Sequence, residues 1–142
     1  MTSTFMRIRK LFPIAIMLII IAILTMQSPS ETLSVSGGLQ NFCKAIVPNA
    51  SGRWATDMHW FRSLLHLPLY FMLGIITAFS FTRPWVSALI CSVVAIADET
   101  FKVFLPTREF EGRDIAFDVI GFLVGIGLVV IIRRLSAGNE RV

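Results

Sequence analysis

Four apolar segments divide the chain, and its polar residues gather between them. The apolar segments cover about residues 11–26, 63–82, 84–104 and 113–132. As helices, they approach or exceed the roughly 30 Å thickness of a membrane's hydrocarbon core. Residues 27–62 are rich in Ser, Gly and Pro, which favours a loop. The pattern predicts an all-α polytopic membrane protein, a bundle of four transmembrane helices that forms one integral membrane domain over residues 1–142.

The first apolar segment has two interpretations. At roughly 24 Å as a helix, it is slightly short for a membrane span, and its basic N-terminal flank also fits a signal peptide. It is long for the apolar region of such a peptide, however, and the sequence TMQSPSETLS that follows has no clear small-x-small cleavage site. We therefore expect an uncleaved first helix.

Composition and charge support a membrane location. Of the 142 residues, 55% are hydrophobic, and the mean hydropathy of +0.74 is too apolar for an ordinary soluble domain. The net charge of +4 comes from bases scattered at the ends of apolar segments, which indicates membrane topology and argues against nucleic-acid binding. Basic clusters beside both terminal segments favour a bacterial cytoplasmic-membrane protein with both termini in the cytoplasm.

Polar residues form stripes on three of the predicted helices. In antiparallel helices, the start of the second, the end of the third and the start of the fourth lie at one membrane face. The second helix carries a stripe of polar and small residues spaced four apart: Arg62, His66, Tyr70 and Gly74. The third places Asp98 and Lys102 one turn apart, with Glu99 beside them.

The fourth predicted helix adds further polar and small residues on one face: Asp114, Asp118, Gly121 and Gly125. Asp118 lies more than a turn inside this helix, where an isolated ionised group costs several kcal/mol unless it is paired, hydrated or neutralised. We therefore predict an outward polar rim in which the acids and bases share a pocket. The candidate basic partners are Arg62, His66, Lys102 and Arg108.

This polar rim has a functional and a structural interpretation. Ionisable residues within membrane spans often mark functional sites, which favours a site for a substrate or a lipid headgroup. Alternatively, the polar side chains hold four short helices together. A lone histidine such as His66 is more often a packing residue than a catalyst, and Tyr70 can simply anchor helix packing. Packing is also the role we assign to the glycines at 74, 121 and 125.

We expect no cofactor and no metal ion. Cys43 lies in a polar connection and Cys91 in an apolar helix, which argues against a disulfide between them. Hard carboxylates and one histidine could hold a divalent cation, but no His/Cys ligand spacing occurs and nearby bases oppose it. The chain has no Walker loop, dinucleotide fingerprint, nucleophile elbow or zinc-protease motif.

Two motifs resemble those of the VanZ-like family of small bacterial membrane proteins, named for an accessory protein of teicoplanin resistance. The sequence HLPLYFMLG at residues 66–74 is similar to the family pattern His-Phe-x-x-Tyr-x-x-Leu-Gly, with Leu67 in place of Phe. The sequences DETFKVFLPTR and DIAFDVIGFLVG follow a second pattern, Asp-Glu-x-x-Gln-x-Phe-x-Pro-Gly-Arg and then Asp-x-x-x-Asn-x-x-Gly-x-x-x-Gly. The resemblance covers about residues 62–129 and implies a membrane protein of the cell envelope, but no particular reaction.

The chain departs from the second pattern at three positions. Lys102 stands in place of Gln, Thr107 in place of Gly, and Asp118 in place of Asn. We hypothesise that Lys102 and Asp118 form a compensating charge pair between the third and fourth helices.

Three functions are consistent with these observations. The first is binding of a lipid headgroup, a lipid-linked envelope precursor or an amphiphilic antibiotic, with Arg108 and Lys102 engaging phosphate or carboxylate and an effect on teicoplanin-type glycopeptide susceptibility. The second is an enzyme acting on an envelope lipid, with His66 or Glu99 as general acid or base, although no covalent nucleophile is evident. The third is a structural role, as a homo-oligomer or as the partner of another membrane protein. Membrane lipids surround the chain in all three.

Overall fold

A computed structural model describes residues 2–26, 29–47, 52–105 and 110–139, and every regular element within them is a helix. The helices are α1 (Thr2–Met26), α2 (Pro29–Ile46), α3 (Arg53–Thr56), α4 (Met58–Ser80), α5 (Pro84–Lys102) and α6 (Gly112–Asn139). The all-α class predicted from the sequence is therefore confirmed.

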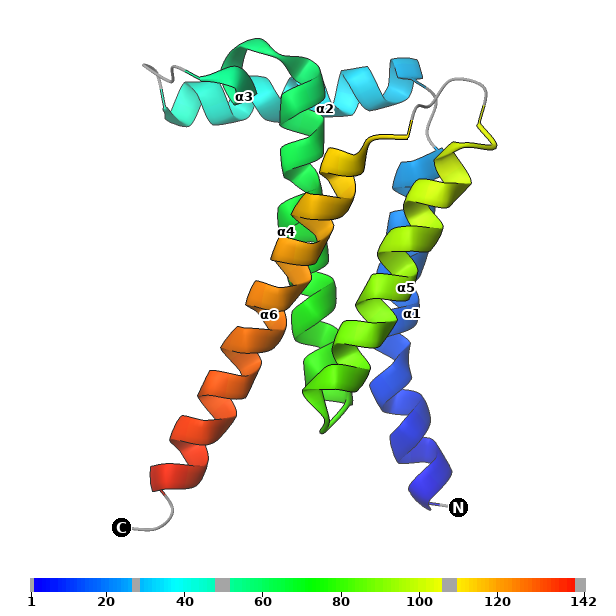
Figure 1. The fold of residues 1–142 in the computed structure, drawn as a ribbon, viewed down its shortest axis with the longest axis vertical. Helices are drawn as coiled ribbons and strands as arrows, with labels where there is room; N and C mark the ends of the chain where they lie inside the picture. The colour runs from blue at the N-terminus through cyan, green and yellow to red at the C-terminus, as the bar shows by residue number, and fades with distance from the viewer. Residues whose placement is uncertain (1, 27–28, 48–51, 106–109, 140–142) are drawn as a thin grey trace.

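The helices α1, α4, α5 and α6 run along the molecule, and α2 lies crosswise at one end of them (Figure 1). The N-terminal end of α1 and the C-terminal end of α6 lie at the opposite end (Figure 1). α4 contacts α1, α2, α5 and α6, and its contact with α6 is the most extensive between any two helices. The first turns of α4 and α6 and the last turn of α5 therefore lie at the same end as α2.

Among the described helices, three are long and apolar enough to cross a membrane. They are Met58–Ser80, Pro84–Lys102 and Gly112–Ala137, with mean hydropathies of 1.6, 1.4 and 2.8. Large apolar side chains on these helices are exposed, for example Phe79 at 58% and Val93 at 59%, and lipid tails are their natural surroundings. The chain is a helical membrane protein. The apolar part of α1, Leu11–Met26, is shorter than the three spans, so a bundle of four spans stays a prediction.

The prediction of a loop over residues 27–62 is wrong for most of that segment, because α2, α3 and the start of α4 fall within it. Pro29 is the first residue of α2. A proline has no backbone N–H, but at this position an N–H group would have no carbonyl partner within the helix. Exposed apolar side chains then recur at helical spacing: Val35, Leu39, Phe42 and Ile46. Ser36 and Gln40 on the same helix are buried. An exposed apolar stripe of this kind is typical of helices that lie at a membrane interface.

The other helix boundaries differ from the prediction by several residues. α4 begins before residue 63, because the side chain of Asp57 caps it by accepting hydrogen bonds from the backbone N–H groups of His59 and Trp60 at 2.9 and 3.4 Å. α5 ends at Lys102, slightly earlier than predicted, and α6 continues to Asn139. α1 begins upstream of its apolar segment.

Close packing between α4 and α6 requires glycine at three positions: Gly74, Gly121 and Gly125. A Cβ atom at Gly121 would lie 2.5 Å from the carbonyl oxygen of Leu67, and one at Gly125 would collide with the carbonyl oxygen of Phe71. At Gly74 the obstacle is the backbone of α6. The two backbones are therefore in direct contact, as in other helix pairs with small residues at their interface.

The opposite end of the α4–α6 pair is held by one basic side chain. The guanidinium of Arg133 on α6 donates hydrogen bonds to the carbonyl oxygens of Ala78 and Phe81, at 2.6 and 3.2 Å. These carbonyls belong to the C-terminal end of α4, where the last carbonyl groups have no N–H donor within the helix. The apolar core packed around the α4–α6 pair includes Tyr70, Leu73, Cys91, Ala95, Phe122 and Val129.

Candidate functional site

Six ionisable side chains from three helices converge toward the end of the molecule where α2 lies. We call this group the charged cluster: His66 on α4, Asp98, Glu99 and Lys102 on α5, and Asp114 and Asp118 on α6. Five of the six residues are buried, and Glu99 and Asp118 have no exposed surface. Because a buried ionised group costs several kcal/mol unless it is paired, the contacts inside the cluster decide which charges are compensated.

Lys102 joins two of the acids. Its Nζ atom lies 2.7 Å from Oε2 of Glu99 and 2.8 Å from Oδ2 of Asp114, which links α5 to α6. The other oxygen of Glu99 accepts a hydrogen bond from the backbone N–H of Glu111 at 2.6 Å. Asp114 lies in the first turn of α6, where the helix dipole stabilises a negative charge. The hypothesised ion pair of Lys102 with Asp118 is not formed between these described residues, because Lys102 is held by Glu99 and Asp114 instead.

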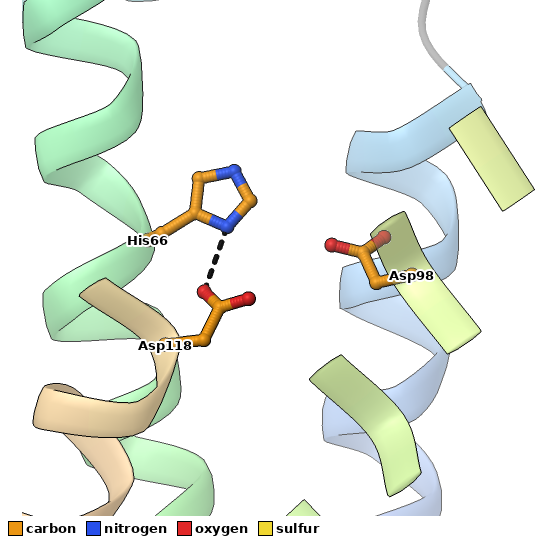
Figure 2. Close-up of side chains that lie close together, drawn as sticks. All are labelled: His66, Asp98 and Asp118. Carbon is orange, nitrogen blue, oxygen red and sulfur yellow. Dashed lines mark hydrogen bonds and ion pairs between the residues drawn. The ribbon is translucent and has the colours of Figure 1, made fainter. Parts of the chain in front are cut away.

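His66 contacts both acids of α6. Its Nδ1 atom lies 2.8 Å from Oδ1 of Asp118, at hydrogen-bond distance (Figure 2), and its Nε2 atom lies 3.5 Å from Oδ2 of Asp114. The ring of Tyr70, one turn further along α4, is stacked on the imidazole with planes 10° apart and centroids 6.3 Å apart. A carboxylate bound to one ring nitrogen fixes the orientation of the ring and leaves the other nitrogen for a further group.

Asp98 faces His66 and Asp118 from α5 (Figure 2). One possible ligand atom from each of these three side chains lies within 4.8 Å of the other two. Asp98 also accepts a hydrogen bond from the hydroxyl of Thr25 on α1, so α1 is tied to the cluster. Thr25 was not selected from the sequence, because a polar residue near the end of an apolar segment does not indicate which helix it contacts.

Two carboxylate oxygens of the cluster are buried without a hydrogen-bond partner among the described residues. They are Oδ1 of Asp114 and Oδ2 of Asp118, and each belongs to a carboxylate whose other oxygen is bound. The described cluster also holds four carboxylates against a single lysine ammonium. Unpaired acceptors and an excess of negative charge are the properties of a site that receives a cation, either an ammonium group or a metal ion.

A pocket of about 330 Å³ adjoins the charged cluster. Part of its wall is apolar and comes from α1, α2 and α4: Ile21, Leu24, Val35, Leu39, Leu65 and Leu69. Another part is polar: Arg62, His66, Asp98, Lys102 and Asp114. A second hollow of about 320 Å³, between α1 and α5, is lined mainly by apolar side chains and also reaches Asp98. An apolar chain and a charged group can therefore occupy neighbouring parts of one site.

The remaining residues selected from the sequence have different positions. Arg62 lines the pocket, and Arg108 lies outside the described residues. Glu111, which was not selected, accepts hydrogen bonds from Ser63 at 3.3 Å and from Arg113 at 2.7 Å, and so fixes the segment that enters α6. In the sequence, Glu111 lies in a charged connection between two predicted helices, and nothing there indicates that it binds Ser63 and Arg113. The acids of the charged cluster are buried between helices, and an outward-facing rim stays a prediction.

These features define a helical membrane protein with a buried charged cluster at one end of its spans. A family model described as VanZ/LLP1 matches residues 11–133. Because the match covers well over half of the chain, the chain belongs to the VanZ/LLP1 family, and the resemblance inferred from its two motifs is confirmed. Comparison with curated proteins and with solved structures gave no match.

Proposed function

We propose that this chain is an envelope membrane protein that binds an amphiphile in the pocket beside the charged cluster. The observation that supports this is the continuity of the pocket, since one volume of about 330 Å³ is bordered both by apolar side chains and by the charged cluster. A lipid headgroup, a lipid-linked precursor or an amphiphilic antibiotic of the teicoplanin type has matching chemistry, with a polar end and an apolar chain. Altered glycopeptide susceptibility is the consequence if the ligand is such an antibiotic.

In this proposal the α2 end faces outward from the cytoplasmic membrane of a bacterium, and both termini are cytoplasmic. Basic residues at the opposite end support this orientation. Arg83 lies in the turn between α4 and α5, and Arg133 and Arg134 lie toward the C-terminal end of α6. Lysine and arginine beside membrane spans are enriched on the cytoplasmic side.

The charges on the pocket wall favour a headgroup that carries both an amine and an anionic group. Oδ1 of Asp114 has no hydrogen-bond partner among the described residues, so it can accept a hydrogen bond from an ammonium group in the pocket. Arg62 lines the same pocket, and its guanidinium suits a phosphate or a carboxylate. Lys102, in contrast, is already bound by Glu99 and Asp114, so it is less free to hold an anion than the sequence suggested.

Filling the pocket is expected to release the bound amphiphile. Val35 on α2 lines the pocket, is 57% exposed and belongs to no ion pair of the charged cluster, so Val35→Trp narrows the pocket without removing a charge. In native nanodiscs at matched folded yield, mass spectrometry should find an amphiphile enriched with the wild type. We expect enrichment to fall by about tenfold in the variant, corresponding to about 1.4 kcal/mol.

The matched control is Phe42→Trp, which enlarges another exposed residue of α2 that does not line the pocket. Its lipid profile should equal that of the wild type. Asp114→Asn tests the headgroup and should reduce the enrichment of amine-containing amphiphiles in particular. Equal profiles for the wild type, Val35→Trp and Asp114→Asn would contradict the proposal, and a single co-isolated membrane protein would then favour the assembly role.

A second candidate function is acid or base catalysis on the bound amphiphile. The observation in its favour is the contact of His66 with the buried carboxylate of Asp118, since an imidazole oriented by a carboxylate is a common general base. Glu99 is less suitable, because Lys102 binds one of its oxygens and the backbone N–H of Glu111 binds the other.

Removal of His66 tests this catalytic function. His66→Ala should slow conversion of an envelope lipid by about 10²- to 10⁴-fold while the folded yield stays normal. The measurement compares envelope lipid pools in cells that express the wild type or the variant at equal levels. Identical lipid pools in the two strains and in cells without the protein would exclude catalysis under those conditions.

A further inference from the structure

We propose that His66, Asp98 and Asp118 form a binding site for a divalent metal ion such as Zn²⁺. Their possible ligand atoms lie within 4.8 Å of one another, and α4, α5 and α6 contribute one residue each. Figure 2 shows the two carboxylates facing each other from different helices, with the imidazole beside Asp118. His66 and Asp98 border the same pocket as Asp114 and Arg62, but the ligands proposed here are different residues from the headgroup contacts.

A second observation, besides the closeness of the three side chains, points to a bound cation. It is a buried carboxylate oxygen of Asp118 that has no hydrogen-bond partner among the described residues. Asp118 has no exposed surface, and its Oδ1 atom is within hydrogen-bond distance of His66. Its Oδ2 atom has no hydrogen-bond partner among the described residues. In Figure 2 the oxygen not joined to His66 points toward Asp98. A buried carboxylate oxygen without a donor is costly, and a cation bound between Asp118 and Asp98 would satisfy it.

The charge of these residues suits an ion with two positive charges. The ammonium of Lys102 is bound by Glu99 and Asp114, and the start of α6 adds its dipole to the stabilisation of Asp114. Within the described part of the chain, the imidazole of His66 is then the one basic group that contacts Asp118, and Asp98 has no ion pair. Two carboxylates this close repel each other strongly in a buried site, and a divalent ion neutralises both.

The contacts around the three residues resemble the outer hydrogen bonds of known metal sites. With Nδ1 of His66 on the ion, its Nε2–H can donate to Oδ2 of Asp114, which lies 3.5 Å away. The hydroxyl of Thr25 donates to Asp98. Outer hydrogen bonds of this kind fix the orientation of metal-binding histidines and carboxylates. One nitrogen with two carboxylates suits Zn²⁺ better than Mg²⁺ or Ca²⁺, which prefer oxygen ligands alone.

Side-chain movement of about an ångström separates the observed arrangement from coordination. Tetrahedral bonds of about 2.0–2.2 Å place ligand atoms roughly 3.4 Å apart, so a pair at the 4.8 Å limit must close by about 1.4 Å. The sequence did not predict this site, because metal motifs are recognised by short spacings, whereas these ligands come from three helices. Asp118 stands where the family pattern quoted above has Asn, so that pattern does not contain all three ligands.

Zinc binding by the chelator-treated full-length protein in nanodiscs tests the proposal. Equilibrium dialysis against Zn²⁺ with metal analysis should give about one tightly bound ion per chain. Asp118→Asn and Asp98→Asn should each weaken zinc binding by more than the roughly 10- to 100-fold that outer-shell changes cause. The control is His59→Gln, which removes a histidine whose side chain is 72% exposed and which should leave the affinity unchanged.

A second measurement identifies the donor atoms of the bound zinc. X-ray absorption should show nitrogen and oxygen donors at about 2.0–2.2 Å, and this result does not require any variant to fold. Sulfur donors at about 2.3 Å would overturn the proposal, because they would place zinc at Cys43 or Cys91. Folded wild type without bound zinc, or equal affinity in folded Asp118→Asn, would overturn it as well.

Discussion

Replacing Lys102 by Met is expected to lower the free energy of unfolding by about 3–5 kcal/mol, one of the largest effects available in this chain. Lys102 is 4% exposed and bridges Glu99 to Asp114 at 2.7 and 2.8 Å. Methionine fills a similar volume but leaves two buried carboxylates without their ammonium. The measurement is equilibrium unfolding in a defined detergent. Lys44→Met on α2 is the matched control and should change stability by no more than about 0.5 kcal/mol.

A double-mutant cycle identifies the partner of Lys102. Adding Glu99→Gln to Lys102→Met should recover part of the lost stability, because it removes one of the uncompensated charges. Adding Asp118→Asn should recover less, since Asp118 is bound to His66 rather than to Lys102. Recovery by Asp118→Asn that exceeds recovery by Glu99→Gln would contradict the observed pairing and restore the hypothesis based on the sequence.

The contrast between these two partners shows what helical periodicity can predict. Spacings of three and four residues correctly place Asp98 with Lys102 on one face of α5 and Asp114 with Asp118 on one face of α6. They do not give the axial offset between two helices, and an offset of one turn decides whether Lys102 meets Asp114 or Asp118. That offset follows from how α5 packs against both α4 and α6, which the spacing of residues within one helix does not give.

The three apolar spans could be predicted because lipid-facing helices must be apolar along their whole length. α2 could not be predicted as easily, because its Ser and Gly residues are weak helix formers and only its apolar stripe has a helical period. The sequence predicted a shared polar pocket but not its apolar wall on α2, for the same reason, since Val35 and Leu39 form part of that wall. The contact from Thr25 to Asp98 joins residues far apart in sequence, and no local pattern contains it.

Replacing Gly125 by Ala is expected to lower the free energy of unfolding by about 1–3 kcal/mol, and doing so together with Gly121→Ala should lower it further. Each added Cβ would meet a backbone carbonyl of α4, at Phe71 and Leu67 respectively, and a backbone cannot move aside as a side-chain end can. α6 must then shift away from α4. The measurement is again equilibrium unfolding in detergent.

The matched control is Gly127→Ala, two residues further along α6, where an added Cβ meets nothing within 4 Å. There alanine should be neutral or stabilise the helix by up to about 1 kcal/mol, so the two substitutions are expected to have opposite signs. Displacing α6 also separates Asp118 from His66, so Gly125→Ala should weaken zinc binding and amphiphile enrichment together. Equal stability of Gly125→Ala and Gly127→Ala would mean that α4 and α6 are not packed backbone to backbone, and the geometry of the charged cluster would lose its basis.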